Sequence, residues 1–124
     1  MMNTEIKRYD VNDRMSRVVV YNGVAHFCGH VAAPSNKTIE EQTTALLARY
    51  EELLEQFGSD KEHILTATIY LKDISLIDGM NKVWDQWIPK GCAPARACVQ
   101  APLAGEEFLV EIVMTAAVIR EIKD

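Results

Sequence analysis

The segment that says most about the fold is the last long apolar run, Leu109-Val110-Glu111-Ile112-Val113-Met114-Thr115-Ala116-Ala117-Val118. Side chains alternate between the two faces of a β-strand, and this run is mainly apolar on both faces. A sheet with one face in water needs only one apolar face per strand. We therefore predict that helices cover one face of the sheet and that further copies of the chain cover the other, in a closed homo-oligomer.

Two charged residues interrupt apolar segments: Glu111 in this run, and Arg96 in the segment 95–101 that precedes it. Charged side chains are seldom buried unless they are paired or used in chemistry. If the two segments form a hairpin that turns near Leu103, Arg96 lies opposite Glu111 on one face. Such a pair suits a small organic acid, because Arg96 can bind its carboxylate while Glu111 handles a proton. The alternative is an ion pair that only holds the two strands in register.

The other elements follow from local signals. Asn22-Gly23 between two apolar runs predicts a hairpin, because a type I′ turn needs positive φ at both central residues. Thr38 and Glu41 match a capping box at the start of a helix, and Gly58 ends that helix. The predicted elements are strands 17–21, 24–28, 64–71, 95–101 and 109–118 and helices 39–57 and 76–87. The order ββαβαββ predicts an α+β fold with one mixed sheet and two helices on one face.

Composition limits the class of protein. The 124 residues fit one domain, residues 1–124, and the net charge of -5 disfavours binding to nucleic acid or to an anionic membrane. No apolar run approaches the roughly 20 residues needed to cross a bilayer. The three cysteines are odd in number and lack Cys-x-x-Cys spacing, and the histidines lack ligand spacing. We therefore expect no disulfide, no metal, no cofactor and a cytoplasmic location.

Several motifs stand at positions typical of one protein family. The clearest is Ala93-Pro94-Ala95-Arg96-Ala97-Cys98-Val99 followed by Val110-Glu111-Ile112, and supporting ones are Cys28-Gly29-His30, the segment 67–73 and Met80-Asn81-Lys82-Val83-Trp84. Together they resemble the RidA (YjgF/YER057c) family, once labelled endoribonuclease L-PSP. Arg14-Met15-Ser16 is similar to a bacterial branch that carries Arg-Met-Ser near its N-terminus. The resemblance covers the chain from about Arg14 to Val118.

This resemblance implies a chorismate-mutase-like fold, a homotrimer with ligand clefts between subunits, and hydrolysis of enamines and imines, such as 2-aminoacrylate, to 2-keto acids and ammonia. By position, Arg96 would be the carboxylate-binding arginine, Glu111 the water-orienting glutamate and Asn81 a pocket asparagine. Cys28 stands where deaminating members carry a serine, and their pocket tyrosine has no counterpart. Cys28 and Arg14 are further candidates for substrate binding; the alternatives are a packed cysteine and a surface charge.

Two other functions stay open at this level. A noncatalytic trimer that binds a small carboxylate-bearing metabolite would use the same cleft, and Cys28 together with the missing tyrosine favours it. An RNA-cleaving or translation-inhibiting protein is suggested by the older family label. The net charge of -5 and the lack of a stripe of basic and aromatic residues oppose that function.

Overall fold

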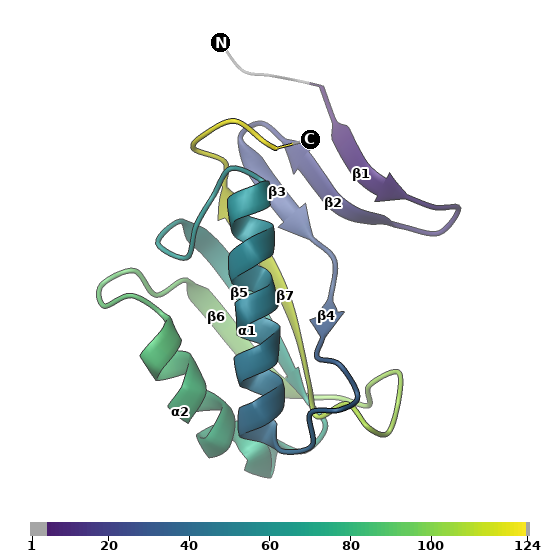
Figure 1. The fold of residues 1–124 in the computed structure, drawn as a ribbon, viewed down its shortest axis with the longest axis vertical. Coiled ribbons are helices and arrows are strands. Elements are labelled where there is room, and N and C mark those ends of the chain that lie inside the picture. The colour runs from purple at the N-terminus through teal and green to yellow at the C-terminus, as the bar shows by residue number, and fades with distance from the viewer. Residues whose placement is uncertain (1–4, 124) are drawn as a thin grey trace.

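The computed structural model describes residues 5–123, which form one seven-stranded sheet and two α-helices (Figure 1). The strands are β1 (Lys7–Val11), β2 (Ser16–Tyr21), β3 (Val24–Phe27), β4 (His30–Val31), β5 (Ile64–Leu71), β6 (Ala95–Gln100) and β7 (Val110–Ala117). The helices are α1 (Ile39–Gln56) and α2 (Ile77–Trp87), and a 3-10 turn, η1 (Ile74–Leu76), precedes α2. The strand order is β1-β2-β3-β7-β5-β6, and the short β4 also pairs with β7.

The structure confirms the hairpin turn and the helix ends that local sequence signals predicted. Asn22 and Gly23 have φ values of 52° and 78°, the positive pair that joins β2 and β3 in a tight hairpin. The Thr38 side chain accepts a hydrogen bond from the Glu41 amide, and the Glu41 carboxylate accepts one from the Thr38 amide, so α1 begins with a capping box. Gly58 follows α1 with φ of 75°.

The sequence analysis did not predict two of the strands, β1 and β4. Strand β1 reads Lys-Arg-Tyr-Asp-Val and is exposed at all but one position, because it lies at the edge of the sheet and pairs only with β2. An edge strand rich in charged residues lacks the apolar alternation by which strands are recognised. Strand β4 is two residues long and has no periodicity at all.

The predicted hairpin between the last two strands is wrong. Strand β5 lies between β6 and β7, with β6 parallel to it and β7 antiparallel to it. Ala67 of β5 is the register partner of both Arg96 and Met114. Helix α2 carries the chain across the sheet between β5 and β6, as a parallel pair requires. The connection 101–109 is longer than the loops of two to five residues that join most hairpins.

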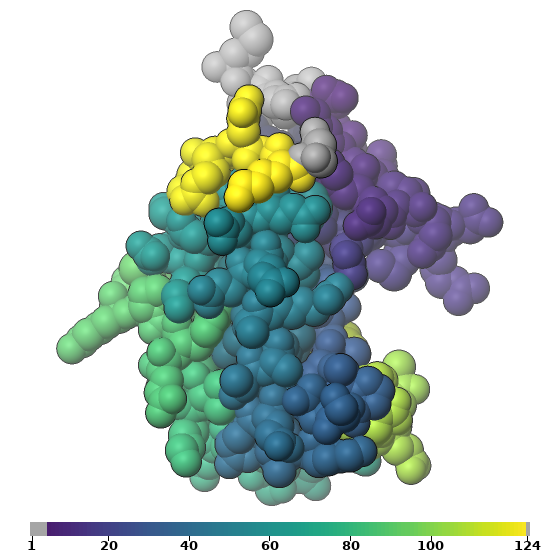
Figure 2. All heavy atoms as spheres, viewed as in Figure 1, coloured from purple at the N-terminus to yellow at the C-terminus, as the bar shows by residue number. Residues whose placement is uncertain are grey.

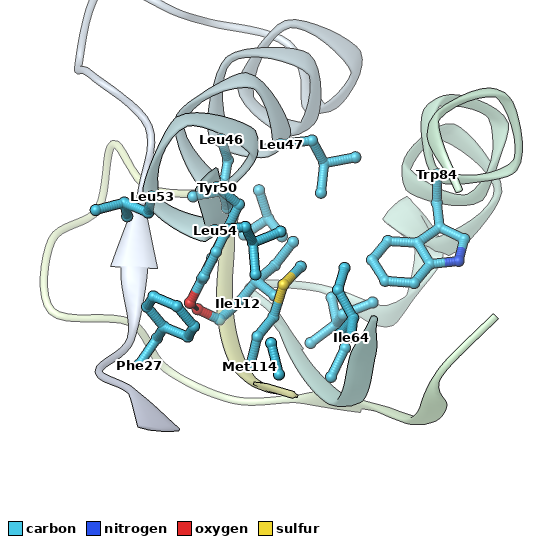
Figure 3. Packing of buried hydrophobic residues seen from close by; sticks show 14 of the residues in the cluster. Phe27, Leu46, Leu47, Tyr50, Leu53, Leu54, Ile64, Trp84, Ile112 and Met114 are labelled. Carbon is cyan, nitrogen blue, oxygen red and sulfur yellow. Dashed lines mark hydrogen bonds between the residues drawn. The ribbon is translucent and has the colours of Figure 1, made fainter. Parts of the chain in front are cut away.

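The core lies between the sheet and the two helices, which pack side by side on one face (Figure 1). Helix α1 buries a stripe that includes Leu46, Tyr50 and Leu54, against Ile112 and Met114 of β7 (Figure 3). The Tyr50 hydroxyl points to the sheet and donates a hydrogen bond to the Ile112 carbonyl over 2.8 Å. This bond ties α1 to the central strand directly beside Glu111.

The second face of the sheet carries the alternate residues. On β7 these include Glu111 and Thr115, and on β5 they include Thr66 and Tyr70, which are partly or largely exposed. The hydroxyl groups of Thr66 and Thr115 share a hydrogen bond of 2.6 Å across the two strands. No helix among residues 5–123 covers this open face. It is the surface on which the predicted self-association would occur.

Candidate functional site

Arg96 lies on the edge strand β6, and its side chain turns toward helix α2. One guanidinium nitrogen, Nη1, donates a hydrogen bond of 2.7 Å to Asn81 Oδ1. The guanidinium carbon lies 5.4 Å from the centre of the Trp84 ring, within range of a cation–π contact. The amide and the ring hold the exposed guanidinium in one plane, while its other N–H groups have no partner among residues 5–123. The sequence-predicted Arg96 and Asn81 therefore lie together, and a carboxylate can approach the fork from solvent.

Glu111 lies on the central strand β7 and points to the open face. Its register partners are Tyr70 on β5 and Val31 on β4. The Glu111 carboxylate packs against Gly29, so closely that a Cβ atom added to Gly29 would collide with a carboxylate oxygen. Within the described part of the chain the carboxylate has no hydrogen-bond or ion-pair partner. It is half-buried, and both of its oxygens are free to accept hydrogen bonds.

Arg96 and Glu111 do not meet within one subunit. Arg96 is in register with Ala67, which is buried under the helices, whereas Glu111 is in register with Tyr70 on the open face. The two charges therefore lie on opposite faces of the sheet, with β5 between their strands. The predicted cross-strand pair is wrong, and so is its structural alternative, an ion pair within the subunit.

Cys28 lines a cavity of about 770 Å³, which is bounded by the β1–β2 hairpin, β4, α1 and the loop 101–109. Figure 2 shows it as a concavity between the projecting hairpin and that loop. Burial raises the pKa of the Cys28 thiol, although Arg17 lowers it in part, so the group stays protonated at neutral pH. Gly29 also lines the cavity, which places the Glu111 carboxylate directly behind its wall.

Arg14 lies in the exposed turn between β1 and β2. Its amide donates a hydrogen bond of 2.8 Å to Asn12 Oδ1, which shapes the turn. The side chain is outside the main cavity and lines a shallow depression with its neighbours in the turn. The structure therefore does not bring Arg14 together with Arg96 or Glu111 within one subunit.

Three cavity residues were missed at the sequence level: Arg17, His30 and Arg49. Arg17 could have been found, because counting outward from the Asn22-Gly23 turn pairs it with Cys28. The Cys28 amide does donate to the Arg17 carbonyl over 2.9 Å. Arg49 gave no signal, since an exposed arginine is ordinary on a helix.

His30 is buried beside Cys28 and Tyr50. Its Nδ1 lies 2.8 Å from the Cys28 carbonyl, which can only accept, so Nδ1 carries the hydrogen. Its Nε2 is buried and has no partner among residues 5–123. Burial lowers the pKa of His30, and the nearby Arg49 and Arg17 lower it further. The imidazole is therefore neutral at pH 7, and it positions the backbone that carries Cys28.

Residues 5–123 contain no group of three or more histidine, cysteine, aspartate or glutamate side chains placed to hold a metal ion. In the same range, neither helix is long and apolar enough to cross a membrane.

Comparison with known proteins identifies the family. The family model described as Endoribonuclease L-PSP matches residues 5–118. The chain belongs to this family, the YjgF family. A RutC family protein from Haemophilus ducreyi is 41% identical over 113 residues, covering 91% of this chain and 97% of that protein. The RutC family protein YoaB from Escherichia coli (strain K12) is 42% identical over 115 residues, covering 91% and 98%.

Solved structures of the YjgF family share the fold. NMB1025 from Neisseria meningitidis, a member of the YjgF protein family, has a TM-score of 0.89 at 41% identity, covering 95% of this chain and 98% of that one. Rv2704 from Mycobacterium tuberculosis, a member of the YjgF/YER057c/UK114 family, has a TM-score of 0.77 at 28% identity, covering 84% and 86%. The resemblance noted in the sequence and the α+β fold with one mixed sheet are thereby confirmed.

Proposed function

We propose that the protein is an imine and enamine deaminase, which hydrolyses reactive 2-imino acids to 2-keto acids and ammonia. The observation that carries the proposal is the state of its two key charges. Arg96 is an exposed guanidinium held in one plane by Asn81 and Trp84, and Glu111 is a carboxylate with no partner among residues 5–123. An oriented cation and an unpaired carboxylate are the two groups that this hydrolysis needs.

The complete site would form between subunits of a homotrimer. Arg96 lies on the helix side of the edge strand β6, and Glu111 lies on the open face of β7. One subunit cannot direct both at a single small molecule. A neighbouring copy that packs against the uncovered face would bring its own Arg96 toward Glu111 and the cavity lined by Cys28. The proposed substrate is therefore a small carboxylate-bearing metabolite bound in a cleft between two subunits.

The reaction needs no cofactor. Arg96 binds the substrate carboxylate through two parallel N–H donors and leaves the neighbouring C=N carbon exposed to attack. Glu111 takes a proton from a water molecule as its oxygen bonds to that carbon, and the C=N π pair moves to nitrogen. Glu111 returns the proton to nitrogen, which gives a carbinolamine. It then takes the proton of the new hydroxyl group and transfers it to nitrogen, so the C=O bond forms as the C–N bond breaks and ammonia leaves. An enamine first takes a proton at its terminal carbon to become the imine.

The fold and the cysteines support two accompanying proposals, a single domain and a cytoplasmic location. One sheet with one core spans residues 5–123, which agrees with treating residues 1–124 as one domain. The three cysteines carry no disulfide, as is usual in a reducing cytoplasm. The family description names an endoribonuclease, but the net charge of -5 disfavours contact with a phosphate backbone.

The test is imine turnover in a coupled assay. An amino-acid oxidase generates the imino acid, semicarbazide competes for it, and the rate of semicarbazone formation is followed with and without the protein. Wild type should lower that rate, and Arg96→Ala should abolish the effect. Arg8→Ala, which removes an exposed charge from edge strand β1, is the matched control and should behave as wild type.

The outcomes separate the candidate functions. Deamination by Arg96→Ala at the wild-type rate would contradict the proposed role of Arg96. If no imine is hydrolysed but a keto acid binds to wild type and not to Arg96→Ala, the protein is a noncatalytic metabolite-binding module. Sedimentation should give a trimer, and a monodisperse monomer would contradict the intersubunit site.

A further inference from the structure

Two arginines face the cavity beside Cys28, and the proposed hydrolysis uses neither of them. Arg17 comes from β2 and Arg49 from the middle of α1, and both line the same space of about 770 Å³. Arg17 lies 3.7 Å from Asp10, its ion-pair partner. Arg49 has no hydrogen bond or ion pair among residues 5–123. An arginine without a partner at the wall of a concavity is available to a ligand.

The cavity lining is positive although the chain is negative. Its charged residues are Asp10, Arg17 and Arg49, which sum to one positive charge, against a net charge of -5 for the chain. Burial lowers the pKa of His30 and raises the pKa of Cys28, so both are neutral at pH 7. Both arginines lower the pKa of each of these two groups, so each arginine lies near both of them. A local positive charge of this kind attracts an anion.

The anion that fits is a single carboxylate. Arginine forks match carboxylate and phosphate geometry equally well, but one net positive charge balances a carboxylate and leaves a phosphate dianion undercompensated. The cavity volume lies within the usual range for small-molecule pockets and has room for a side chain of two or three carbons with its terminal group. Gly29 lines this space, and its backbone also packs against the Glu111 carboxylate, so the cavity and Glu111 adjoin at a residue that has no side chain between them.

We propose that Arg17 and Arg49 bind the side-chain carboxylate of a dicarboxylic 2-imino acid, while Arg96 of the neighbouring subunit binds its α-carboxylate. This inference rests on the proposed deaminase function and specifies its substrate class. The reaction is unchanged: water adds to the C=N carbon, and ammonia leaves to give a dicarboxylic 2-keto acid. The second carboxylate takes no part in the chemistry and contributes binding and orientation.

The experiment compares substrates that differ only in that charge. Imines are generated from glutamate and glutamine, and from aspartate and asparagine, with oxidases that act on each, and kcat/KM is measured. Wild type should prefer the acidic member of each pair by about tenfold, the usual effect of one charge-assisted hydrogen bond. Arg49→Gln should bring the ratio close to one by lowering only the acidic rate. Lys123→Gln, which removes an equal charge from the C-terminal segment, should leave the ratio unchanged.

A binding measurement keeps this inference separate from the proposed function. Calorimetry with 2-oxoglutarate and its neutral side-chain amide tests the second carboxylate site without any turnover. If no imine is hydrolysed by wild type, the proposed function fails, yet about tenfold tighter binding of 2-oxoglutarate that is lost in Arg49→Gln would still support the site. Equal affinity for the two keto acids would overturn the inference. So would an equal loss for both ligands in Arg49→Gln, or an equal change in Lys123→Gln.

Discussion

Gln42 should contribute about as much to stability as a large buried hydrophobic residue, although it is a polar side chain. It is buried on α1, and its amide makes three hydrogen bonds. The Nε2 group donates to the carbonyls of Asn36 and Glu107 over 3.0 and 2.8 Å, and Oε1 accepts from the Leu109 amide over 2.8 Å. The side chain therefore fastens the loop 101–109, one wall of the cavity, to the first turn of α1.

The expected cost of Gln42→Ala follows from these contacts. Each hydrogen bond contributes about 1 kcal/mol net, so the free energy of unfolding should fall by about 3 kcal/mol. With an m-value of about 1.5 kcal/mol/M for a chain of this size, the urea midpoint should fall by about 2 M. The protomer concentration must be equal in all samples, because association shifts apparent stability. Hydrogen exchange adds a local readout, since the Leu109 amide should lose its protection.

Gln56→Ala is the matched control. Gln56 lies at the end of the same helix, is exposed, and its side chain has no hydrogen bond among residues 5–123. Both substitutions change helix propensity by the same few tenths of a kcal/mol, so this effect cancels between them. Urea midpoints that agree within 0.3 M (about 0.5 kcal/mol) for the two variants would refute the argument that these buried hydrogen bonds hold the loop.

Two further predictions concern the site and the acid limit. Gly29→Ala should lower deaminase kcat by about tenfold or more, because the new Cβ displaces the Glu111 carboxylate. Thermal stability should change little, because the backbone φ of Gly29 is not positive. A wild-type kcat in this variant would contradict the prediction. Burial raises the pKa of Asp60, but hydrogen bonds from His63 and Arg120 lower it more, so the pKa lies below the ordinary value. The resulting stability is complete at neutral pH and declines as the pH falls below about 4 toward the lowered pKa. Asp60→Asn should therefore be destabilised relative to wild type at pH 7, and by less near pH 3, in urea unfolding. An equal difference at both pH values would contradict it.

Local structure was predictable wherever neighbouring residues decide the conformation. Asn22-Gly23 predicted a hairpin because few other residues adopt two positive φ values in succession. Thr38 and Glu41 predicted the start of α1 because their side chains bond to amides three residues away. In each case the interaction that decides the structure lies within four residues, so its signal is present in a short window of sequence.

The candidate site was predictable as a set of residues but not as an arrangement. Arg96 and Glu111 stand out as charges in apolar segments, and the resemblance added Asn81, which does contact Arg96. The predicted hairpin placed Arg96 opposite Glu111, because neither segment carries a sign of which strand pairs with it. Strand β5 lies between β6 and β7 only because α2 forms a crossover from β5 to β6. In this arrangement Arg96 and Glu111 lie on opposite faces of the sheet.

The residues that line the cavity could not be predicted as a group from the sequence either. Arg49 is one of several charged residues on α1, and only the fold shows that it lines the same cavity as Arg17. The β1–β2 hairpin and the loop 101–109, which bound that cavity, are distant in sequence and carry little periodicity. No local pattern records that they lie on two sides of one space.

By itself, the sequence determined the Asn22-Gly23 turn, the helix ends and the family, and it singled out Arg96 and Glu111 as candidate site residues. The tertiary structure alone decided that these charges lie on opposite faces of the sheet and that Arg17 and Arg49 share a cavity. The physical reason is the range of the interactions concerned. Capping bonds and turn dihedrals act between near neighbours, whereas strand order is decided by how the whole chain buries its apolar faces, and that depends on every element at once.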